Sequence, residues 1–96
     1  MSFEPVDRVL EGWLQAHGVR LYKEFTGEPV RSFDVVSPAG DKVQIWIDPV
    51  SDQGDVQVHV WDYRRRRRAL SGTISELVRL VDEAHAIAQI WVSTGT

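Results

Sequence analysis

The sequence predicts an α+β fold: a helix, a four-stranded antiparallel meander and a long C-terminal helix, with both helices on one face of the sheet. Apolar residues recur at the three-to-four spacing of a helix near both ends of the chain, and at every second residue in between. The connections between the strand-like segments are short. Because neighbouring parallel strands need a long crossover, short connections favour antiparallel pairing.

The first helix is expected over residues 5–17. Pro5 suits the first helical turn, where the N–H that proline lacks would have no partner. Gly18 suits the left-handed position that ends many helices. One face of the segment is apolar and should be buried; its residues are Val6, Val9, Leu10, Trp13 and Leu14.

Four strands are expected over residues 19–25, 30–37, 43–48 and 56–61. Segments rich in Gly, Pro, Ser and Asp separate them, as is typical of turns. The third strand alternates most regularly, with Val43, Ile45 and Ile47 on one side and Gln44, Trp46 and Asp48 on the other.

The last helix is expected over residues 74–91, which contain neither glycine nor proline. Thr73 and Glu76 have the spacing of a capping box at its start. Its apolar stripe is wider than one packing surface needs. The residues that widen it are Leu80, Ile87 and Ile90. We expect Trp13 and Leu14 of the first helix to cover part of this stripe; otherwise the stripe would form a homodimer interface.

Residues 1–92 are expected to form one domain and residues 93–96 a flexible tail, since a chain of 96 residues has the length of one domain. The absence of cysteine excludes disulfides and thiolate metal sites. The first residues lack the basic and apolar segments of a signal peptide. No segment is apolar and long enough to cross a membrane. These features predict a cytoplasmic protein.

Strand alternation should place the aliphatic residues under the helices and leave a second face in solvent. That second face collects Tyr22, Trp46, His59 and Trp61, and the register should set Trp46 across from Gln57 or His59. This is more aromatic area than a solvent-facing sheet needs, which predicts partner-binding residues. The alternatives are that the arginine-rich loop or the C-terminal tail covers the rings, or that strand twist partly buries both faces.

Five consecutive basic residues form the second candidate site: Arg64, Arg65, Arg66, Arg67 and Arg68. The rest of the chain carries six basic and fourteen acidic residues, a net charge of −8. If the run continued the preceding strand, alternate guanidiniums would point into the core at a large desolvation cost, so we expect an exposed loop. The run could bind anions such as RNA, phosphate or an acidic protein patch, with Trp61 and Tyr63 for stacking. The alternative, which the acidic remainder of the chain favours, is a solvated loop whose charge offsets that of the domain.

No group of residues predicts catalysis, a metal or a cofactor. His17, His59 and His85 are not accompanied by a recognisable nucleophile, so an enzyme is not expected. Asp48, Asp52 and Asp55 lack the spacing of a calcium loop and are expected to serve an ordinary turn.

The sequence therefore favours a small non-enzymatic protein-binding domain that uses its aromatic sheet face. An antitoxin-like or immunity-like protein, acidic because its target is basic, is one version, by analogy of size and charge. The alternative is an RNA-binding or anion-binding module that uses the arginine run, which the acidic remainder of the chain disfavours.

Overall fold

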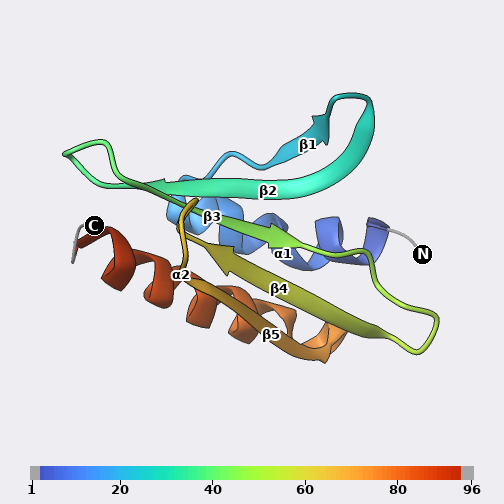
Figure 1. Cartoon of the computed structure of the whole chain (residues 1–96). Helices are drawn as coiled ribbons and strands as arrows, with labels where there is room; N and C mark the ends of the chain where they lie inside the picture. Colours follow the sequence, from blue (N-terminus) through green and yellow to red (C-terminus); the bar gives the residue numbers. More distant parts are fainter. Residues whose placement is uncertain (1–2, 94–96) are drawn as a thin grey trace.

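The computed structural model describes residues 3–93 and shows two helices and one open sheet (Figure 1). The elements follow the chain in the order α1 (Glu4–His17), β1 (Tyr22–Phe25), β2 (Glu28–Val36), β3 (Lys42–Ile47), β4 (Asp55–Trp61), β5 (Arg67–Thr73), a single 3₁₀ turn η1 (Ile74–Glu76), and α2 (Leu77–Ser93). All strand pairs are antiparallel, and the spatial order of the strands is their order along the chain. The predicted α+β class and antiparallel meander are confirmed.

The prediction of four strands is wrong by one, because residues 67–73 form the edge strand β5. The backbone N–H of Asp62 donates to the carbonyl of Arg66 (3.2 Å) and closes the turn between β4 and β5. Arg67 and Arg68 therefore belong to a strand and not to a loop. Arg68 lies opposite the buried Val60 but is itself exposed, since β5 is at the edge of the sheet. The desolvation cost that excludes arginine from a central strand does not apply there.

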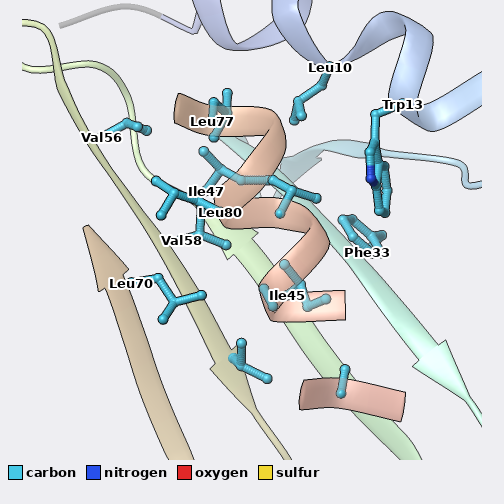
Figure 2. Close-up of a cluster of buried hydrophobic side chains, with 14 of the residues drawn as sticks. Leu10, Trp13, Phe33, Ile45, Ile47, Val56, Val58, Leu70, Leu77 and Leu80 are labelled. Atoms are coloured by element: carbon cyan, nitrogen blue, oxygen red, sulfur yellow. The ribbon is translucent and has the colours of Figure 1, made fainter. Parts of the chain in front are cut away.

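The core lies between the helices and one face of the sheet. The inward residues of β3 and β4 are at most 2% exposed: Val43, Ile45, Ile47, Val56, Val58 and Val60. Figure 2 shows Leu10 and Trp13 of α1 and Leu77 and Leu80 of α2 gathered around this aliphatic layer. Both helices thus pack on the same side of the sheet, which leaves the other side without a covering helix.

The wide apolar stripe of α2 is partly covered by α1, as expected. Leu80 is buried, and Nε1 of Trp13 donates a hydrogen bond to Oδ1 of Asp82 at 2.6 Å. Further along α2, Ile87 is half-buried and Ile90 is 60% exposed. A homodimer through the end of this stripe stays a prediction.

The helix ends follow the predicted signals with small shifts. Pro5 lies in the first turn of α1, and Gly18 has the left-handed conformation (φ 62°) that ends it. The N–H of Thr73 donates to Oε1 of Glu76 (2.9 Å), although the first turn is 3₁₀ and not α. Ser93, expected in the tail, is the last residue of α2; residues 94–96 of the expected tail lie outside the described residues. Between residues 3 and 93, no helix has the length and apolar character needed to span a membrane.

Three rings from the two helices meet beside the core. The imidazole of His17 stacks on the indole of Trp13, with ring centroids 4.0 Å apart. The imidazole of His85 is T-shaped to both rings, with its centroid 5.4 Å from each of theirs. Burial, and secondarily the positive charge of a protonated His17, lower the pKa of His85 below 6.5, against the opposing effect of Asp82. The folded state therefore favours neutral His85.

This cluster predicts a loss of stability in mild acid. The unfolded chain binds a proton at His85 more readily than the folded chain, so the free energy of unfolding should be at its full value above about pH 6.5 and should fall below it. Urea unfolding measured at about pH 7.5 and about pH 5.5 should show a smaller loss for His85→Gln than for the wild type. Equal losses in the two proteins would show that His85 does not carry the effect.

Candidate protein-binding face

The outer face, defined here as the sheet face turned away from α1 and α2, brings together the four aromatic residues singled out in the sequence. The strand register sets them in two neighbouring rows. The first row runs Tyr22, Ser32, Trp46, His59 and Ala69 from β1 to β5. The second row runs Asp34, Gln44, Trp61 and Arg67 from β2 to β5. The prediction that Trp46 lies across from Gln57 or His59 is confirmed for His59.

Trp46 is partly exposed and is held by its neighbour across the strand pair. Its indole stacks on the imidazole of His59, with ring centroids 4.6 Å apart and planes inclined by 10°. Nε2 of His59 in turn donates to Oδ2 of Asp48 at 2.8 Å. The carboxylate fixes the imidazole, and the imidazole fixes the indole, so contacts within the domain hold this part of the outer face in place.

Trp61 is fixed in a comparable way by Tyr63, which follows the end of β4. Their ring centroids lie 4.7 Å apart, and the phenol of Tyr63 donates to Oδ1 of Asp34 at 2.6 Å. Burial raises the pKa of Tyr63 above its usual value, and the hydrogen bond to Asp34, the charge of Asp34 and the nearby Tyr22 act in the same direction. The phenol is therefore a neutral donor at physiological pH. Tyr63 has a left-handed backbone (φ 65°), a strained conformation for a bulky residue.

The arginine run divides between two sides of the sheet. Arg66 turns toward α2: its Nε donates to Oδ2 of Asp62 (2.9 Å), its Nη2 donates to the carbonyl of Trp91 (3.2 Å), and its Cζ lies 5.2 Å from the Trp91 ring centroid. Burial alone would raise the pKa of Asp62, but hydrogen bonds from Arg66 and from the backbone of Arg64 outweigh it and lower that pKa. Arg66 thus anchors the turn.

Arg67 lies on the other side, against the outer face, and Arg64, in the turn, borders both sides. Together with Gln44, Trp46 and Trp61 they line a shallow hollow of about 500 Å³. The guanidinium of Arg67 lies 5.7 Å from the centroid of the Trp46 indole, within cation–π range. The structure therefore joins two sites that were separate hypotheses from the sequence.

On the opposite side of Trp46 lies a larger groove of about 670 Å³, bordered by the β1–β2 hairpin. Figure 1 shows β2 curving along its length, so that this hairpin leaves the plane of β3, β4 and β5. Six aromatic residues contribute to the groove: Phe3, Tyr22, Phe25, Trp46, Trp61 and Tyr63. Three carboxylates also line it: Glu24, Asp34 and Asp48. Sequence reasoning missed this groove, because it depends on the bend of β2 and on the register shift between Tyr22 and Glu24.

Within residues 3–93, no three histidine or carboxylate side chains are grouped as metal ligands would be. The Asp-rich turn between β3 and β4 is closed by hydrogen bonds between Ser51 and Asp55: Ser51 N–H donates to the carbonyl of Asp55 (2.9 Å), and Asp55 N–H donates to Oγ of Ser51 (3.1 Å). Comparison of the chain with protein-family models, curated proteins and solved structures finds no match. The function is therefore argued from the geometry of the outer face.

The two faces of the sheet predict different costs for removing a tryptophan. Trp13 is 6% exposed in the core, so Trp13→Ala should lower the free energy of unfolding by roughly 3–5 kcal/mol. Trp46→Ala should cost well below that range, because Trp46 is partly in solvent already. Chemical unfolding of the two variants checks this expectation. Equal losses would mean that Trp46 belongs to the core.

Proposed function

We propose that the protein is a small non-enzymatic protein-binding domain and that its partner docks on the outer face. The observation that carries the proposal is the aromatic ridge, defined as Trp46 and Trp61, which stands partly exposed between a groove and a hollow on the helix-free face. Tryptophan in such positions supplies much of the energy of protein interfaces, with polar residues at the rim.

The order of the ridge supports binding. Trp46 is held against His59, and Trp61 against Tyr63, by contacts that exist in the free domain. Binding through side chains that are already fixed loses little conformational entropy. The arginine run was one candidate to cover the ridge. Arg66, however, binds the carbonyl of Trp91 on the α2 side, while Arg64 and Arg67 lie beside the ridge. An antitoxin-like or immunity-like domain with a basic target is one version of this function, by analogy of size and charge.

Capture from a lysate of the native host tests the proposal. We expect the tagged wild type to retain a protein that the double variant Trp46→Ala/Trp61→Ala loses, because that variant removes both anchors of the interface. Val78→Ala is the matched control, since Val78 is an exposed apolar residue on α2, away from the outer face and outside the predicted homodimer stripe. Identical proteins retained by all three forms would contradict the proposal.

A second candidate function is binding of single-stranded RNA, and the specific observation that favours it is the hollow shared by Arg64, Arg67 and the ridge. Guanidiniums beside exposed indoles can contact phosphates while bases stack on the rings. The net charge of −8 outside the run opposes this function, so we rank it second.

The RNA candidate predicts a salt-dependent gel shift with single-stranded RNA that Arg64→Gln/Arg67→Gln abolishes. Its affinity should fall steeply with salt, since phosphate contacts release counterions. The control is Arg65→Gln, an exposed member of the same run; Arg66 is left intact because it anchors the turn. Submicromolar binding at physiological salt, lost only in the double variant, would place RNA binding ahead of protein binding.

A further inference from the structure

The groove beside β1 contains a slot with an aromatic residue on each side. Tyr22 and Trp46 both pair with Ser32 of the strand between them, so they stand on either side of a small residue. Two strand spacings separate them, about 10 Å between Cα atoms. One side of the Trp46 indole is occupied by His59 of β4, and its register neighbour on β2 is Ser32, whose side chain is too small to cover a ring. Tyr22, Ser32 and Trp46 all line the groove.

The charges around this slot are negative on the side of β1 and β2. Asp34 follows Ser32 by two residues on the same face of β2 and lies next to the phenol of Tyr63. Glu24 is exposed on β1 and lines the same groove. Aromatic rings and carboxylates around one slot attract a cation, through the ring quadrupole and through charge. Among residues 3–93, the cation that also lines the groove is Arg31, which is held in an ion pair with Asp7 of α1 (2.6 Å).

Building on the function proposed above, we propose that this slot receives an arginine side chain from a basic segment of the partner protein. A guanidinium is flat and stacks on rings, and it can donate two hydrogen bonds to a carboxylate such as Asp34. The free domain already shows the attraction, since Arg67 places its guanidinium 5.7 Å from the Trp46 centroid. The acidic remainder of the chain, with its net charge of −8, would also speed the approach of a basic partner.

Nuclear magnetic resonance with small probes tests this inference. The probes are a blocked Gly-Arg-Gly peptide, its citrulline counterpart and its glutamate counterpart; citrulline keeps the shape of arginine without the charge. The indole N–H resonances report on the four tryptophans separately. We expect the arginine peptide to shift the Trp46 resonance in a saturable way. The citrulline peptide should bind with an affinity at least about fivefold lower.

Variants assign the effect to the slot. Tyr22→Ala removes one wall at a position that is 59% exposed, so folding should be unaffected while the affinity for the arginine peptide falls about fivefold. Asp34→Asn removes the charge but keeps an acceptor for Tyr63, and it should weaken binding as well. Glu11→Gln, which removes an exposed carboxylate from α1, is the matched control and should bind as the wild type does.

Equal binding of arginine and citrulline would overturn the inference, as would stronger binding of the glutamate peptide or no shift with any peptide. Each of these results is compatible with a partner captured through the aromatic ridge, which would leave the protein-binding proposal standing. Conversely, an arginine-specific shift at Trp46 would support the slot even if lysate capture found no protein dependent on the ridge.

Discussion

The pairing of β3 with β4 is the constraint on which the rest of the structure depends. Ile45 lies opposite Val60, and the adjacent pair sets Trp46 opposite His59. A shift of one residue would exchange the faces of one strand, because side chains alternate strictly along a strand. The inward aliphatic residues of both strands are at most 2% exposed, so any such shift would bring them into solvent. Burial of one face therefore holds the aromatic residues on the other, and the outer face follows from the hydrophobic core.

The edges of the sheet explain how this small domain combines opposite charges. At one edge, β5 accepts Arg67 and Arg68 because an edge strand can leave guanidiniums in water, and charged edge residues also discourage pairing with other chains. Toward the other edge, the curved β1–β2 hairpin carries Glu24 and Asp34. The aromatic ridge lies between these regions, so the outer face is negative on the side of β2 and positive on the side of β5. A partner with matching charges would have one preferred orientation.

Much of the fold could be predicted because its signals are local. Three local signals each predicted an observed element. The alternation of residues 43–48 and 56–61 predicted β3 and β4, Gly18 predicted the end of α1, and the Thr73–Glu76 spacing predicted the start of the last helical segment. The fifth strand was not predicted, because the cost of burying arginine excludes a central strand but not an edge strand. Leu70, flanked by the small residues Ala69 and Ser71 after a short turn, was the available signal. The place of Phe25 in the groove and the hydrogen bond of Tyr63 to Asp34 could not be predicted, since they arise from the hairpin bend and from a left-handed residue.

The aromatic ridge is partly exposed, while the aliphatic residues on the inner face of the same strands are in the core. Paramagnetic broadening of the indole N–H resonances by a soluble, uncharged spin label measures this directly in the free protein. We expect strong broadening for Trp46 and Trp61, and protection for Trp13, whose N–H donates a hydrogen bond to Asp82 of α2. Protection of Trp46 to the same degree as Trp13 would contradict the account, because the outer face would then be covered and could not receive a partner.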